Sequence, residues 1–169
     1  MENVPIEIER KYIISKPNFS SLVKENEYHR SEIVQIYLSG AKNATHRIRK
    51  RSDLSHTVYT ETVKVRIDGM SAYEDEREIS EQDFTALSAK IADGTRPIRK
   101  VRHTFRYGDL TFEIDEYPEW ENTCIMEIEL PTREKSFKIP DFINIIREVT
   151  GDGAYSNAAM SRAFPKEDE

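Results

Sequence analysis

The chain is poor in cysteine and has no long apolar segment. Cys124 is the one cysteine among 169 residues, so no internal disulfide can form and nothing indicates an oxidising compartment. No run of 18 or more apolar residues occurs, and the N-terminus carries no signal-peptide pattern. These absences argue against membrane-spanning and disulfide-framework proteins, and they predict a cytoplasmic location.

An excess of positive charge is also absent. The chain has 25 Lys and Arg residues against 31 Asp and Glu residues, a net charge of −6. General nucleic-acid binders neutralise phosphates with a basic surface, so this balance argues against that class. No Pro/Ser-rich linker or low-complexity tract divides the chain. We therefore predict one domain over residues 1–169, monomeric or homodimeric, with a frayed acidic tail at 165–169 and neither membrane nor nucleic acid as partner.

The most informative stretch that is present is IEIERKYII, residues 6–14. Glu7, Glu9 and Lys11 share one parity, and mainly apolar residues hold the other, which predicts a β-strand with one charged face. Paired carboxylates suit a hard divalent cation such as Mg²⁺, and a nearby lysine suits an anion bridged to that metal. For this strand alone, a charged face in water is an equally good interpretation, since antiparallel sheets commonly have one.

The alternation returns along the chain, and most charged faces carry one sign. An ordinary solvent face mixes signs, because like charges opposite one another repel. Segregated charge fits a polyanion and its metal ions held between the strands. The basic faces are Arg47-Arg49-Arg51, Lys64-Arg66 and Lys100-Arg102, and the acidic faces are Glu74-Glu76-Glu78, Glu113-Asp115 and Glu127-Glu129.

The remaining signals predict an antiparallel α+β fold of roughly eight strands and four helices. Asp68-Gly69 predicts a hairpin turn, and Ser80 with Asp83 predicts a capped helix start. Strands are expected near 6–14, 33–38, 44–51, 57–67, 71–79, 99–106, 110–117 and 126–130. Helices are expected at about 18–25, 80–92, 140–149 and 154–164.

In order and sign, these motifs resemble those of the CYTH superfamily, also called triphosphate tunnel metalloenzymes. The family's E-x-E-x-K strand is matched by Glu7, Glu9 and Lys11, and its R-x-R strand by Arg47 and Arg49. Its further motifs are matched by Thr62 and Lys64, Glu74 and Glu76, Lys100 and Arg102, Asp115, and Glu127 with Glu129. Two departures are Ala72, where the family often has arginine, and ENTCI at 121–125, which replaces a glycine-rich turn. The resemblance implies an eight-stranded antiparallel β-barrel that forms a tunnel, with flanking helices, open at both ends or plugged by the C-terminal helix.

The resemblance also implies roles for the charged residues, with a triphosphate held in the tunnel beside Mg²⁺ or Mn²⁺. The side chains implied to bind substrate are Lys11, Arg47, Arg49, Lys64, Lys100, Arg102 and Glu76. Those implied to bind metal are Glu7, Glu9, Asp115, Glu127 and Glu129. The catalytic set is Glu7, Glu9 and Lys11, with the two glutamates orienting the attacking water. Ser156 and Asn157 could touch the ligand from the closing helix, and Tyr37 could contact it too, but helix capping is the expected role of the first two residues and packing that of Tyr37.

Three functions stay open. The expected one is metal-dependent hydrolysis of inorganic triphosphate or a small organic triphosphate, because the EIERK motif resembles bacterial tunnel enzymes that act on inorganic triphosphate. The second is a class IV adenylyl cyclase that converts ATP to cyclic AMP and pyrophosphate, although no residue cluster is identified for adenine. The third is a non-catalytic polyphosphate-binding module, which would need the bases but not all the acidic residues.

Overall fold

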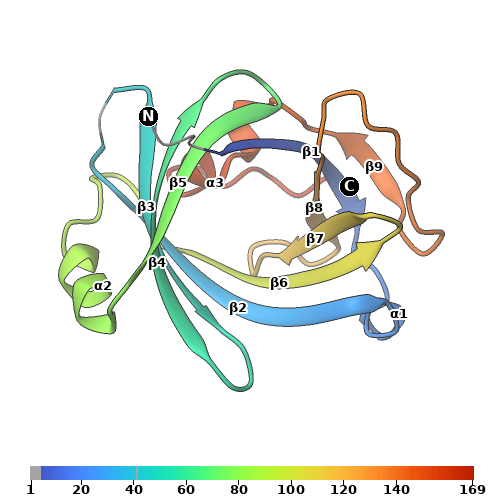
Figure 1. Cartoon of the computed structure of the whole chain (residues 1–169), viewed down its shortest axis with the longest axis horizontal. Coiled ribbons are helices and arrows are strands. Elements are labelled where there is room, and N and C mark those ends of the chain that lie inside the picture. Colours follow the sequence, from blue (N-terminus) through green and yellow to red (C-terminus); the bar gives the residue numbers. More distant parts are fainter. Residues whose placement is uncertain (1–4, 41) are drawn as a thin grey trace.

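In the computed structural model, which describes residues 5–40 and 42–169, nine strands form one antiparallel sheet, and eight of them close into a ring. The strands are β1 (Ile6–Ser15), β2 (Asn26–Leu38), β3 (Ala44–Ser52), β4 (Thr57–Arg66), β5 (Ser71–Ile79), β6 (Ile98–Tyr107), β7 (Leu110–Glu116), β8 (Thr123–Glu129) and β9 (Ile145–Glu148). The ring runs β5-β4-β3-β2-β6-β7-β8-β1 and closes where residues 6–8 of β1 pair with residues 71–73 of β5 (Figure 1). The expected eight-stranded antiparallel ring is confirmed.

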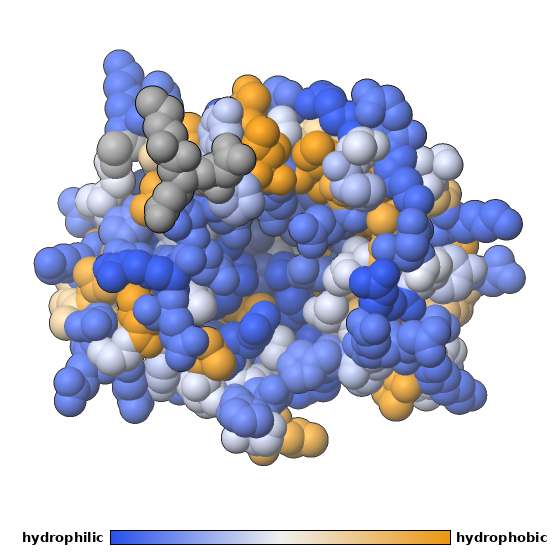
Figure 2. Space-filling view, viewed as in Figure 1, coloured by the Kyte–Doolittle hydropathy of each residue, from blue (hydrophilic) through white to orange (hydrophobic). Residues whose placement is uncertain are grey.

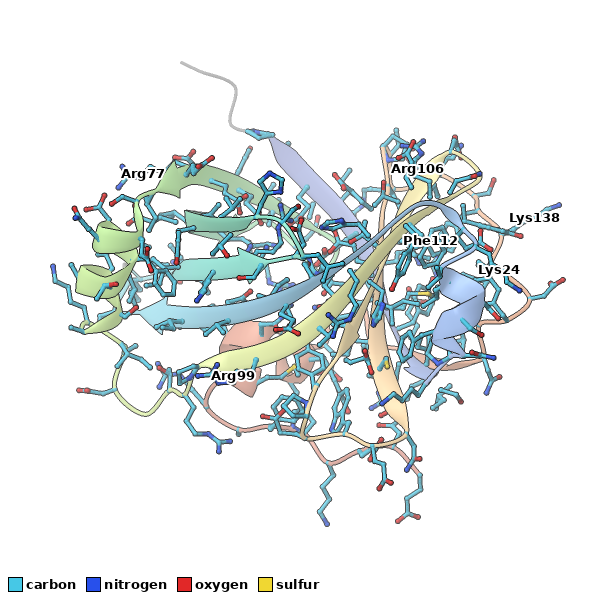
Figure 3. All side chains as sticks on the ribbon, turned by 90° about the horizontal axis from the view of Figure 1, so that it is seen from below. Lys24, Arg77, Arg99, Arg106, Phe112 and Lys138 are labelled. Atoms are coloured by element: carbon cyan, nitrogen blue, oxygen red, sulfur yellow. The ribbon has the colours of Figure 1, made fainter. Side chains whose placement is uncertain are left out.

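Two apolar clusters lie on the outer face of this ring, each covered by a helix. Helix α1 (Phe19–Leu22) packs over β1 and β6–β8, where Phe105 and Phe112 are fully buried. Helix α2 (Glu81–Ser88) covers β2–β5 through Phe84, which contacts Tyr59. Figure 3 shows Phe112 on the α1 side and Arg77 at the opposite end, beside α2. Because these apolar residues face outward, the alternating inward positions are free to carry charge.

The C-terminal segment closes one end of the interior with aromatic side chains. The 3₁₀ turn η1 (Gly153–Tyr155) and helix α3 (Asn157–Met160) lie beside Trp120, whose ring centroid is 5.3 Å from that of Phe164. The expected closing helix over 154–164 is therefore much shorter than predicted. Ser156 explains the difference, since its backbone is extended (φ −72°, ψ 141°) and separates η1 from α3.

The helix expected over 140–149 is wrong. Residues 145–148 form β9 and pair with Tyr12–Ile14 of β1, on the edge that β5 leaves unpaired. Two adjacent β-branched isoleucines favour this extended conformation. A salt bridge of 2.7 Å between Arg10 and Glu148 adds to the pairing. In the described residues, no helix combines the length and apolar character needed to cross a membrane.

The tail at 165–169, where a frayed end is expected, makes hydrogen bonds to the rest of the described chain. The Glu167 carboxylate accepts hydrogen bonds from the backbone N–H groups of residues 121–123. Trp120 Nε1 donates to the backbone carbonyl of Pro165 at 3.0 Å. The tail thus satisfies backbone donors of the segment that departs from the family's glycine-rich turn.

Candidate functional site

The interior of the ring contains a charged cavity of about 490 Å³. Figure 2 shows a hollow near the middle of the molecule, surrounded mainly by hydrophilic residues. All the predicted site residues line the cavity except Asp115 and Glu129. Those that line it are Glu7, Glu9, Lys11, Arg47, Arg49, Lys64, Glu76, Lys100, Arg102 and Glu127.

The two charge signs occupy two halves of the ring. Among the adjacent strands β4-β3-β2-β6, strands β4, β3 and β6 supply the lining arginines and lysines, whereas β2 supplies Tyr37. Gln35 of β2 accepts a hydrogen bond from Arg49. The other four, β7-β8-β1-β5, supply glutamates, with Lys11 of β1 as the exception. The cavity therefore has a basic half (β4, β3, β2, β6) and an acidic half (β7, β8, β1, β5).

The basic half holds more positive charge than nearby carboxylates neutralise. Among the described residues, Arg49 has no carboxylate at salt-bridge distance, and its Nε donates to Gln35 Oε1 at 3.0 Å. Burial, together with Arg47 and Arg102, lowers the pKa of Arg49 to about 10. Burial also lowers the pKa of Lys100 to about 7, with Arg102 and Arg49 adding to the effect against the opposing influence of Asp115. Crowded cations of this kind suit a polyanionic ligand.

Asp115 lies behind the basic half and does not line the cavity. Its carboxylate accepts from Lys100 Nζ at 2.8 Å and from Arg102 Nε at 2.7 Å. Burial would raise the pKa of Asp115, but Arg102 and Lys100 hold it lowered, at about 2. Because both bases occupy this carboxylate, the geometry favours a positioning role for Asp115 over the metal-binding role that the family resemblance implies.

The acidic half crowds carboxylates together. Burial, and then the neighbouring Glu127, raise the pKa of Glu9 to about 8. In the strand register, Glu127 lies opposite Lys11 on β1 and opposite Glu113 on β7. Its Oε1 forms a salt bridge with Lys11 Nζ at 3.3 Å. Burial raises the pKa of Glu113 as well. Such crowding is relieved by a cation or by protons.

Glu129 takes a different position from the other predicted acids. It is exposed, pairs with Glu9 in the β1–β8 register and lies outside the cavity lining. Burial of part of the side chain raises its pKa, and Glu7 and Glu113 add to the rise. Glu129 therefore lies at the edge of the acidic half, close enough for the charges of Glu7 and Glu113 to affect its pKa.

Several lining residues fall outside the family motifs. Arg51, Arg66 and Glu113 line the cavity, in agreement with the charged faces on which the period-two pattern places them, although the family motifs give them no role. Arg66 lies directly opposite Ala72 in the β4–β5 register, so it supplies a cation beside the position where the family often has arginine. Asn157 also lines the cavity, and no strand pattern could have indicated it.

The raised pKa of Glu9 predicts a pH-dependent stability of the metal-free protein. The folded state binds this proton more tightly, since the pKa rises from 4.5 to about 8. The stabilisation is fully present below about pH 4.5 and is lost as the pH rises through 8. Glu9→Gln stays neutral, so its melting temperature should exceed that of wild type by roughly 5 °C near pH 8 and by less near pH 5. Calorimetry in EDTA at both pH values tests this, and parallel pH profiles for the two proteins would contradict it.

Known proteins resemble this chain in sequence and in structure. The CYTH domain family profile matches residues 5–158. An inorganic triphosphatase of Acetivibrio thermocellus is 35% identical over 156 residues, which cover 91% of this chain and 92% of that protein. Among solved structures, the inorganic triphosphatase NE1496 has a TM-score of 0.60 and 24% identity over 95% of this chain and 97% of its own. The PH1819 protein of Pyrococcus horikoshii OT3 has a TM-score of 0.58 and 24% identity over 76% and 80% of the two chains. At these identities the two structures support a shared fold.

Proposed function

The chain belongs to the CYTH domain family, and from that premise we propose that it hydrolyses inorganic triphosphate to pyrophosphate and orthophosphate with a divalent metal ion. The observation that carries the proposal is the segregated charge of the cavity. Its basic half suits the phosphate chain, and its acidic half suits the metal. The name of the Acetivibrio thermocellus relative supports the same substrate. The single cysteine supports a cytoplasmic location, and a monomer or homodimer stays a prediction.

The acidic half fits a hard cation such as Mg²⁺ or Mn²⁺. Its donors are carboxylate oxygens, and the described lining residues include neither cysteine nor histidine. Burial is the main cause of the raised pKa values of Glu9 and Glu113, and the nearby Glu127 adds to both, so a cation among these carboxylates would relieve their repulsion. Across residues 5–40 and 42–169, no three such side chains already converge on one point, so Glu7, Glu9 and Glu127 would draw together around an ion. When bound, the ion would neutralise phosphate charge and acidify water.

The side chains of the cavity would bind the substrate and activate the attacking water. Arg47, Arg49 and Arg102 would hold the phosphate oxygens, because guanidinium groups make paired contacts with them. Lys11 and Lys64 stand between the two halves, where Lys11 contacts Glu127 and Lys64 contacts Glu7. These lysines would bind the end of the chain nearest the acids. Glu7 and Glu9 would orient the attacking water and accept its proton, so that a terminal P–O–P bond breaks and pyrophosphate leaves.

The cavity favours inorganic triphosphate over a nucleotide. Among the described lining residues, Tyr37 is the one aromatic side chain, and its hydroxyl is held by Gln35 Nε2 at 2.6 Å. The cavity lining is therefore mainly charged and offers a nucleobase little aromatic surface on which to stack. This observation speaks against the adenylyl cyclase alternative, which needs an adenine site that places the ribose hydroxyl in line with the α-phosphate.

Phosphorus NMR of reaction mixtures with Mg²⁺ or Mn²⁺ tests the assignment. Inorganic triphosphate should give pyrophosphate and orthophosphate, with kcat/KM at least roughly tenfold above that for ATP, which corresponds to about 1.4 kcal/mol. ATP should give ADP and orthophosphate. Cyclic AMP with pyrophosphate as main products would overturn the hydrolase assignment, whereas tight binding without turnover would favour a non-catalytic polyphosphate-binding module.

A further inference from the structure

Asn157 is the first residue of α3, yet its side chain does not cap the helix. The cap is Ser156, whose Oγ accepts from the backbone N–H of Ala159 at 3.1 Å. Asn157 instead faces the cavity. The sequence-based assignment of both residues to capping is thus correct for Ser156 and wrong for Asn157.

Two donors fix the orientation of the Asn157 amide. Its Oδ1 accepts from the Tyr117 hydroxyl at 3.0 Å and from Lys100 Nζ at 3.4 Å. When Lys100 is protonated it has donors and no acceptor, so the amide oxygen is the atom of Asn157 that suits it. The opposite atom, Nδ2, makes no hydrogen bond to any other residue that the structure describes, and it is not among the buried polar atoms without partners. It therefore presents two N–H donors to the accessible side of the residue.

That side is the cavity's basic half. Lys100 and Arg102 lie on β6, and Lys100 is fully buried and held between Asp115 and Asn157. The Tyr117 ring, whose hydroxyl holds the Asn157 oxygen, is buried and packs edge-to-face against the buried Trp120. An anion that reaches Lys100 from the cavity must therefore also meet the Asn157 amide.

Resting on the proposed function, we infer that Asn157 is a substrate-positioning residue, whose Nδ2 donates a hydrogen bond to a phosphate oxygen of inorganic triphosphate at the plugged end of the cavity. The contact defines where the phosphate chain ends, because aromatic side chains close the space beyond it. A neutral amide can perform this role beside Lys100 without adding to the crowding of cations.

Two substitutions distinguish this role from a purely structural one. Asn157→Ala removes both the oxygen and the donors, whereas Asn157→Asp keeps an oxygen for Tyr117 and Lys100 but replaces the donors with a negative charge. If the amide binds phosphate, affinity for inorganic triphosphate should fall at least roughly tenfold in Asn157→Ala and further in Asn157→Asp. Wild-type affinity for inorganic triphosphate in Asn157→Ala, or in Asn157→Asp despite its added negative charge, would overturn the inference.

Calorimetric titration of inorganic triphosphate in EDTA measures binding without turnover. Arg162→Ala is the matched control, since it removes the exposed contact between Arg162 Nη1, just after α3, and the Asp93 carbonyl at 2.9 Å without touching the cavity, and it should bind like wild type. A loss of affinity in Arg162→Ala as large as in Asn157→Ala would overturn the inference, because loosening the plug would then explain both. Steady-state kinetics with Mg²⁺, measured separately, distinguish a failure of the Asn157 inference from a failure of the proposed hydrolase function. Wild-type turnover with an unchanged KM in both Asn157 variants would refute the positioning role and leave the proposed hydrolysis intact.

Discussion

Glu127→Gln should lower kcat for inorganic triphosphate by at least roughly a thousandfold, about 4 kcal/mol of transition-state stabilisation. Glu127 lies between Lys11 on β1 and Glu113 on β7, at the centre of the acidic half. The amide keeps the shape of the side chain but loses the charge that would hold a cation. Glu9→Gln should have a comparable effect, and a steady-state assay with Mg²⁺ measures both. Removing the metal with EDTA should abolish turnover in wild type, and added Mg²⁺ or Mn²⁺ should restore it.

Glu116→Gln provides the matched control for this loss. Glu116 lies on β7 like Glu113, but it contacts His103 Nε2 at 2.7 Å outside the cavity, so the variant should keep wild-type kcat. Glu129 gives a graded comparison, because it borders the acidic half without lining the cavity. We expect Glu129→Gln to lose less activity than Glu127→Gln. Full turnover by Glu127→Gln, or by wild type in EDTA, would refute the proposed metal site.

Arg49→Met should weaken the binding of inorganic triphosphate by roughly a hundredfold, since one charge-assisted contact contributes about 1.5–3 kcal/mol. The same change should raise the melting temperature of the ligand-free protein by a few degrees, because it removes a cation that no described carboxylate pairs at salt-bridge distance. Calorimetric titration and thermal unfolding measure the two effects. Triphosphate should raise the wild-type melting temperature by mass action.

Lys100 should behave differently from Arg49 when the ligand is absent. Lys100 Nζ is paired with the buried Asp115 at 2.8 Å, so Lys100→Met removes one partner of a buried ion pair and should lower the melting temperature. Lys50→Met is the control on β3, since Lys50 is next to Arg49 in sequence and takes the opposite face of the strand. Its affinity for triphosphate should be unchanged. A destabilised Arg49→Met that binds triphosphate normally would contradict a basic half built for an anion.

The strands and the contents of the cavity could be predicted from the sequence because period-two alternation is a local signal. Glu7, Glu9 and Lys11 illustrate this, since their parity alone places them on one face. The position of Asp115 could not be predicted in the same way. Parity places it on the inward face, but only the packed structure shows that Lys100 and Arg102 occupy its carboxylate.

The errors concern segments whose conformation depends on distant partners. Residues 145–148 form a strand because β1 offers an unpaired edge, and no local pattern reveals that edge. Asn157 follows Ser156 and shares its preference for helix starts, so propensity alone could not show that one side chain caps and the other faces the cavity. Glu167 is bound by backbone groups far away in the chain, which an acidic terminal sequence does not indicate.

The place of β1 in the ring has a consequence for how the protein is made. This strand is synthesised before the other described strands, yet its neighbours are β5, β8 and β9, so its two edges are complete only when residues up to Glu148 are available. Such non-local pairing slows folding, because distant parts of the chain must meet before their contacts form. The glutamates of β1 therefore reach their final positions only after residues up to Glu148 have been made. We expect the acidic half to form in one late step during biosynthesis.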